Sequence, residues 1–153
     1  MQQAETPFGI SFIEFALIAA LLTGCAMSFA PELVAAAKSA SEQALDDDLE
    51  MFRRQIAQYR LDHDDLLPAH GTNSEATFLN QLTRRTSRHG EVAERAHFGP
   101  YIIGSIPVNP FSGLSRVLVV PGPLAAGHTT GDGTHGWAFS STTGEIRANT
   151  SGR

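Results

Sequence analysis

Apolar residues dominate the beginning of the chain. From Ile10 to Ala30 the sequence contains 21 residues without a proline, and Glu14 is its only charged residue. A helix that rises about 1.5 Å per residue would extend roughly 31 Å over this run, which is enough to cross the apolar part of a bilayer. The pattern therefore predicts a transmembrane helix over residues 10–30.

The pattern becomes amphipathic after Pro31. Residues 32–66 contain neither glycine nor proline, and large apolar residues recur at spacings of four, three, four and three. That spacing is typical of one helical face, so we expect the helix to continue as a soluble half over residues 31–67, with Pro31 kinking or loosening it rather than ending it. The residues expected to face the core are Leu45, Leu49, Phe52, Ile56 and Tyr59.

Polar residues mark the end of this helix and the start of a second one. The run Asp62-His63-Asp64-Asp65 is interpreted as a solvated helix terminus. Further on, Thr72 and Glu75 have the spacing of a capping box. A short helix is predicted over residues 76–85, with one apolar side formed by Phe78, Leu79 and Leu82, followed by a polar loop over residues 87–97.

The last third of the chain has strand patterns. Residues 116–120 are mostly branched and apolar, and residues 137–140 alternate as strands do. The turn at Thr143-Gly144 leads into residues 145–149, which predicts an antiparallel hairpin. The expected fold class is therefore α+β: a long N-terminal helix, with its first half transmembrane, packed on a small antiparallel sheet within a loop and sheet domain over residues 68–153.

Length and charge limit the functions that this chain can have. Its 153 residues allow one small domain and an anchor. A net charge of −5 with dispersed acids argues against nucleic acid as a partner, because phosphate binding needs clustered cations. Cys25 is the only cysteine, which excludes an intrachain disulfide. No pairing of a nucleophile with a base and no phosphate-binding loop stands out, so an enzyme is not expected.

The short leader before the apolar run does not fit a secretory signal. Such a signal places its small-residue cleavage site after the apolar run, whereas Gly9 precedes the run here. Glu14 is also unusual, because a carboxylate in an apolar membrane helix is costly unless it is paired. Together these two residues indicate a function for the start of the helix.

The segment Gly9-Ile10-Ser11-Phe12-Ile13-Glu14 resembles the leader-cleavage motif of type IV pilins and pseudopilins. The resemblance implies that a prepilin peptidase removes residues 1–9 after Gly9 and methylates the new terminus at Ile10. It also implies that Glu14 pairs with the N-terminal ammonium of a neighbouring subunit during assembly.

Two later segments resemble the major pseudopilin of type II secretion. One is Gly99-Pro100-Tyr101-Ile102 followed by Pro107-Val108-Asn109-Pro110-Phe111, and the other comprises the Gly136-Trp137 start, the Gly144-Glu145-Ile146 turn and the Asn149 ending. Pro107 and Pro110 favour an extended connector, which Phe111 is expected to anchor in the core.

The resemblance implies a subunit of a pseudopilus filament in protein secretion. Its partners would be further copies of the chain, other pseudopilins, the prepilin peptidase and an inner-membrane assembly platform. The protein would cross the bacterial inner membrane once, and its C-terminal domain would be periplasmic.

One loop contains candidate metal ligands. In the major pseudopilins the corresponding loop binds calcium, and Asp132 is the acidic residue that this chain offers between Gly122 and Gly136. Calcium usually takes six to eight oxygen ligands, including several carboxylates. A zinc site formed by His128, Asp132 and His135 is a second hypothesis, and a solvated glycine-rich turn is a third.

Two alternatives to the pilin interpretation remain open. The segment Leu21-Leu22-Thr23-Gly24-Cys25 matches a bacterial lipobox, which would make the protein a lipoprotein lipidated at Cys25. That interpretation leaves Glu14 and the Gly9 motif without a role. The other alternative is a single-pass anchored periplasmic protein that does not assemble.

Overall fold

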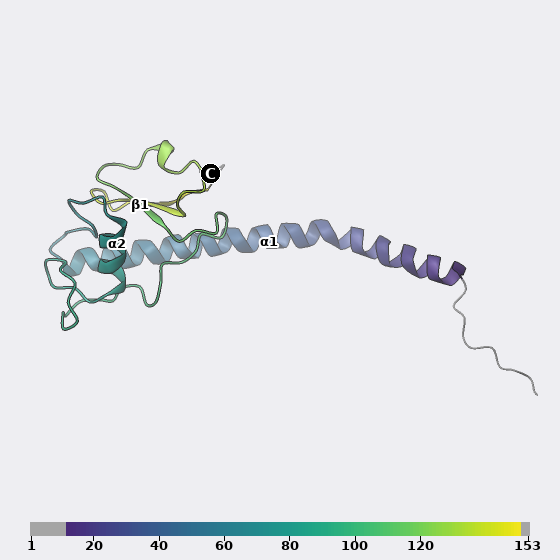
Figure 1. The fold of residues 1–153 in the computed structure, drawn as a ribbon, viewed down its shortest axis with the longest axis horizontal. Helices are drawn as coiled ribbons and strands as arrows, with labels where there is room; N and C mark the ends of the chain where they lie inside the picture. Colours follow the sequence, from purple (N-terminus) through teal and green to yellow (C-terminus); the bar gives the residue numbers. More distant parts are fainter. Residues whose placement is uncertain (1–11, 151–153) are drawn as a thin grey trace, which may run out of the picture. The chain divides into compact units, whose positions relative to one another are not determined.

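The structure is a computed structural model that describes the backbone of residues 12–150 and the side chains of residues 32–150. It divides into two compact units, residues 1–40 and residues 41–153. The elements are α1 (Phe12–Asp62), α2 (Glu75–Thr83), β1 (Val117–Val120), the short 3-10 helix η1 (Ala126–His128), β2 (Trp137–Ser140) and β3 (Ile146–Ala148) (Figure 1).

The helix α1 has 51 residues and continues through Pro31. It ends at Asp62, where Asp64 and Asp65 adopt left-handed backbone angles that an α-helix cannot continue through. The predicted soluble half therefore ends a few residues earlier than residue 67. Among residues 32–150, no helical stretch is long and apolar enough to cross a membrane. The side chains of the predicted span over residues 10–30 lie outside the described part, so that span stays a prediction.

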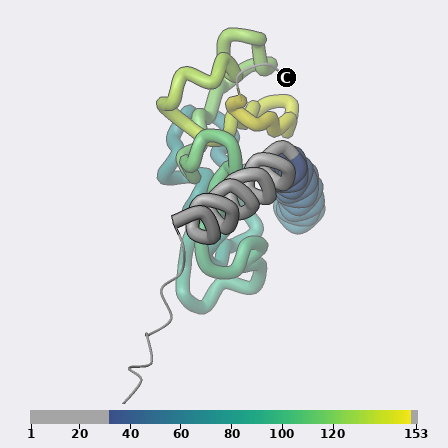
Figure 2. The backbone as a smooth tube through the Cα atoms, turned by 90° about the vertical axis from the view of Figure 1, so that its right-hand side faces the viewer, coloured from purple at the N-terminus to yellow at the C-terminus, as the bar shows by residue number. Residues whose placement is uncertain are grey.

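The predicted apolar face of α1 is confirmed. Within the unit of residues 41–153, this face packs against the sheet and α2, and Figure 2 shows the rest of this unit on one side of the helix. The ring centroids of Phe52 and Trp137 lie 5.0 Å apart, and those of Phe78 and Phe139 lie 4.6 Å apart. The buried or partly buried residues of the face are Leu45, Leu49, Phe52, Ile56 and Tyr59.

The small sheet is mixed rather than antiparallel. Its strand order is β1-β2-β3, with β1 parallel to β2 and β2 antiparallel to β3. The hairpin predicted from the Thr143-Gly144 turn is confirmed, with Phe139 opposite Ile146. The expectation of an antiparallel sheet is wrong for β1, because residues 121–136 form a long connection that returns the chain to the same end of the sheet, as parallel strands require.

The cap of α2 differs from the predicted one. The N-cap is Ser74, whose hydroxyl accepts a hydrogen bond from the Thr77 backbone N–H at 3.2 Å. Glu75 is instead the first residue of the helix, and its carboxylate accepts a hydrogen bond from the Val117 backbone N–H at 2.8 Å. The Thr72–Glu75 capping box is therefore wrong, and Glu75 connects α2 to β1.

Asn109, rather than Phe111, anchors the proline-containing connector. Phe111 is 44% exposed, whereas Asn109 is fully buried. The Asn109 amide donates to the Gly136 carbonyl at 2.7 Å, and its oxygen accepts from the Phe111 backbone N–H at 2.9 Å. The Trp137 indole donates to the Pro107 carbonyl at 2.9 Å. The connector is thus fixed by buried hydrogen bonds, and the expectation of an aromatic anchor at Phe111 is wrong.

Candidate functional site

The predicted processing and assembly residues lie outside the described side chains. Gly9 and Ile10 precede the first described residue. Glu14 and Cys25 belong to α1, but only their backbone is described. Their roles in cleavage, methylation, assembly and the alternative lipidation stay predictions.

The loop between β1 and β2 is organised around one carboxylate oxygen. The Asp132 Oδ1 atom accepts hydrogen bonds from the Thr134 backbone N–H at 3.1 Å and from the Thr134 hydroxyl at 2.8 Å. It also accepts a hydrogen bond from the Asn149 amide at 3.0 Å. These three donors stabilise the ionised carboxylate and lower the pKa of Asp132 from its ordinary value of 3.8 to about 2.

Asn149 attaches this loop to the sheet. It directly follows β3 and is fully buried. Besides its bond to Asp132, its amide donates to the His135 carbonyl at 2.9 Å, and its oxygen accepts from the Gly131 backbone N–H at 2.7 Å. The Asn149 side chain therefore holds the loop at three positions. Asn149, which the sequence places at the end of the hairpin, has the structural role of fixing this loop.

The two loop histidines also serve to hold the loop. The His135 Nε2 atom donates to the His128 carbonyl at 2.9 Å, and its Nδ1 atom lies 2.7 Å from the Thr134 hydroxyl. The His128 Nδ1 atom accepts from the Ala125 backbone N–H at 3.0 Å. Among residues 32–150, no three histidine, cysteine, aspartate or glutamate side chains come together. The described structure therefore does not bring His128, Asp132 and His135 together as zinc ligands.

The donor set of this loop does not match that of calcium. Asp132 is the only carboxylate in the loop, and its Oδ1 atom is already surrounded by hydrogen-bond donors. Calcium usually takes several carboxylates among its six to eight oxygens. Hydrogen bonds account for the closure of the loop, and calcium at Asp132 remains an untested expectation.

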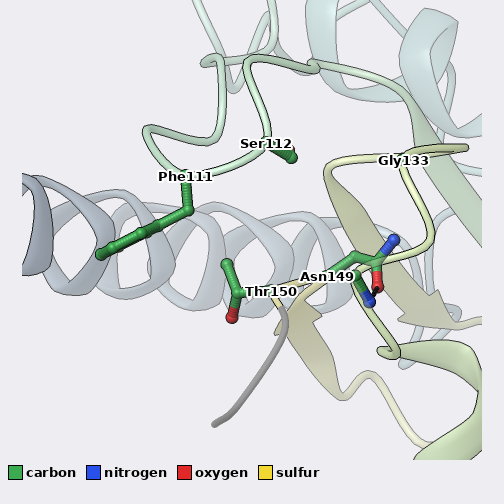
Figure 3. A pocket seen from close by; sticks show the side chains of 6 residues that line it. Phe111, Ser112, Gly133, Asn149 and Thr150 are labelled. Carbon is green, nitrogen blue, oxygen red and sulfur yellow. Dashed lines mark hydrogen bonds between the residues drawn. The ribbon is translucent and has the colours of Figure 1, made fainter.

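A shallow pocket of about 270 Å³ opens beside this loop (Figure 3). Figure 3 shows Phe111 and Ser112 on one side of it, and Gly133, Asn149 and Thr150 on the other. Together with Gly131, these residues contribute amide, hydroxyl and aromatic groups but no titratable side chain. Proton transfer needs such a side chain, so the lining is not suited to acid–base catalysis.

A second group of polar side chains lies at the end of α1. His63 is fully buried, so its interpretation as part of a solvated terminus is wrong. Its ring stacks on Tyr59 with a centroid distance of 3.7 Å, and its Nδ1 atom donates to the Tyr59 carbonyl at 2.7 Å. Its Nε2 atom lies 2.9 Å from the Thr86 hydroxyl. The imidazole thus connects the end of α1 to the loop after α2.

Tyr101 completes this group. Its hydroxyl donates to the Asp62 carboxylate at 2.9 Å. Burial, followed by this bond to Asp62, raises the pKa of Tyr101, and burial raises the pKa of Tyr59 to about 12. Both phenols therefore stay neutral near pH 7 and act as structural hydrogen-bonding groups. The Tyr101 and Ile102 backbone N–H groups both donate to the Leu82 carbonyl at 2.9 Å. The Gly-Pro-Tyr-Ile segment therefore provides hydrogen-bond donors for a carbonyl group in the last turn of α2.

Two of the hydrogen-bonded groups in the described structure are thus centred on Asp132 with Asn149 and on His63 with Tyr101. Both groups fix loops to the core. Comparisons with models of known protein families, with curated proteins and with solved structures find no match to this chain.

Proposed function

We propose that this protein is a structural subunit of a pilin-type filament, most similar to the major pseudopilin of type II secretion. The observation that carries the proposal is the continuity of α1. The helix is described from Phe12, close behind the candidate cleavage site at Gly9, to Asp62, where its last turns contribute to the core. A subunit that is anchored by one end of a helix and carries a small folded body at the other end needs this arrangement.

Processing comes first in the proposed mechanism. A prepilin peptidase removes residues 1–9 and methylates Ile10. The processed subunit crosses the inner membrane once through residues 10–30, and its C-terminal domain lies in the periplasm. An inner-membrane assembly platform then adds it to a filament of identical copies and other pseudopilins, which acts in protein secretion.

Glu14 supplies the register of assembly in this proposal. An unpaired carboxylate in the membrane is costly, and pairing it with the ammonium of Ile10 in a neighbouring copy offsets part of that cost. A subunit in the wrong register leaves both charges unpaired. The pairing therefore favours one position of the new subunit over all others.

The unit of residues 41–153 supports a structural role. Its buried polar side chains, such as His63, Asn109 and Asn149, hold loops against the core. The pocket beside the Asp132 loop has no titratable group in its lining. The proposal therefore assigns this unit the role of the folded body of a filament subunit.

The substitution Glu14→Gln tests the proposal, because it removes the charge and keeps the size of the side chain. The expected variant is membrane-bound and folded, but its filament yield in electron micrographs of sheared cells is strongly reduced. Glu94→Gln is the matched control, since Glu94 is an exposed residue of the loop after α2. Wild-type filament yield from Glu14→Gln would refute the assembly role.

The lipobox at Leu21–Cys25 favours a second candidate function. In that case the chain is cut before Cys25 and the rest is an acylated lipoprotein. Labelling of cells with a radioactive fatty acid distinguishes the two, because the pilin-type proposal predicts an unlabelled protein. Labelling that disappears in Cys25→Ser would favour the lipoprotein.

A further inference from the structure

The segment of α1 over residues 32–40 has an uncovered apolar surface. All nine of its side chains are exposed within the described structure, with Leu33 at 68% and Val34 at 70%. Leu33, Ala37 and Ala40 recur at spacings of four and three, which places them on one helical face. Large apolar side chains such as Leu33 and Val34 are stabilised when a partner covers them.

A groove in the other unit has a complementary lining. It has a volume of about 410 Å³ and lies between α1, β3 and the loop around η1. Its apolar lining includes Leu45 and Leu49 from α1 and Ile146 and Ala148 from β3. β3 is an edge strand of the sheet, so on this side the sheet ends at the groove.

Each of the two surfaces has an exposed charged residue that is complementary to one on the other. Arg53 lines the groove, is exposed and forms no ion pair among the described residues. Glu32 directly precedes Leu33, is exposed and likewise forms none within the described part of the chain. Lys38 of the same segment is exposed as well, so the segment offers one carboxylate and one ammonium group. The carboxylate of Glu32 is the group complementary to the guanidinium group of Arg53 in the groove.

We infer that this groove receives residues 32–40 of a second copy of the chain. Leu33 and Val34 of the second copy pack against Leu49 and Ala148, and Glu32 faces Arg53. The inference rests on the proposed function and deepens it, because it names a pair of surfaces that join the folded bodies in the filament.

The two surfaces are different parts of the chain, so the contact is heterologous. Each copy offers one helix segment and one groove, and a contact of this type adds copies one after another into an open filament where the rotation between copies does not close a ring. An isologous contact would stop at two copies. The complementary pair therefore suits an open filament rather than a closed dimer.

Photo-crosslinking in intact cells tests the inference on the full chain. The variant Val34→p-benzoyl-phenylalanine places a photoreactive side chain on the segment and leaves Cys25 unchanged. Irradiation of assembled filaments is expected to give a ladder of covalent multimers. Mass spectrometry of the products should locate the adducts in residues 45–53 or 146–150. The matched control is Leu61→p-benzoyl-phenylalanine, since Leu61 is also exposed on α1 at 77% and is expected to give no adduct in the groove.

Charge exchange provides an independent measurement. Glu32→Arg and Arg53→Glu are each expected to lower filament yield by about two- to fivefold, as for an exposed ion pair, and the double variant is expected to restore most of it. Additive losses in the double variant would contradict the pairing.

The result separates this inference from the proposed function. Filaments that form while the adducts fall outside the groove, or on a different protein, overturn the groove contact and leave the filament role intact. A wild-type protein that forms no filaments overturns the proposed function, and the groove contact with it.

Discussion

The Asn149 amide donates a hydrogen bond to the Asp132 carboxylate across 3.0 Å and joins the long β1–β2 loop to the end of β3. The two residues lie 17 positions apart in the sequence. Through this contact a loop without strands or long helices acquires a fixed position against the sheet. Asn149 is fully buried, whereas the Asp132 side chain is 45% exposed.

Asn149→Ala is expected to destabilise the fold by about 2–3 kcal/mol, because it removes the buried hydrogen bonds that Asn149 makes to the His135 carbonyl and the Gly131 N–H. Urea unfolding of the full chain in detergent measures this change. Asn80→Ala is the matched control, since Asn80 is exposed on α2 and should change stability by less than about 0.5 kcal/mol. Equal effects of the two substitutions would contradict the anchoring role.

The low pKa of Asp132 predicts that the folded protein loses stability in acid. Its folded pKa of about 2 lies below the value near 4 expected for an unfolded aspartate. The ionised carboxylate therefore stabilises the fold fully above pH 4, and this contribution disappears as the pH falls towards 2. Asp132→Asn is expected to be less stable at pH 7 and to show a shallower decline between pH 4 and pH 2. Parallel pH profiles for the two proteins would contradict this account.

Gly136 must lack a side chain. A Cβ atom at this position would collide with the Leu114 carbonyl, which belongs to the backbone and cannot rotate away. Gly136→Ala is expected to cost about 1–3 kcal/mol or more in the free energy of unfolding. Gly127→Ala is the matched control, because its Cβ would have open space. A shift in the unfolding midpoint no larger than that of the control would show that the loop adapts.

Periodicity along α1 made most of the core predictable. The stripe from Leu45 to Tyr59 is buried as expected, and Phe78 and Leu82 confirm the buried side of α2. His63 extends the same stripe, since it follows Tyr59 by four residues. Three neighbouring aspartates made the sequence appear solvated at this point. The helical spacing predicts the burial of His63 better than the polarity of its neighbours does. A histidine can be buried when its ring is stacked and both of its ring nitrogens have hydrogen-bond partners.

Contacts between residues that lie far apart in the sequence were the part of the fold that could not be predicted. The strand pattern of residues 116–120 does not reveal its neighbour, and the parallel pairing of β1 with β2 depends on the path of the intervening loop. Phe111 was expected in the core because it is aromatic, but buried hydrogen bonds of Asn109 fix the connector instead. The contact between Asn149 and Asp132 likewise arises only when the hairpin and the loop are folded together.

The N-terminus of the mature protein tests the central claim most directly. Intact mass and N-terminal sequencing of the chain from its native membrane are expected to show a start at N-methyl-Ile10. Gly9→Leu should retain the leader, because the candidate cleavage site is then blocked. A chain that begins at a lipidated Cys25, or one that keeps residues 1–9 in the wild type, would contradict the pilin-type account.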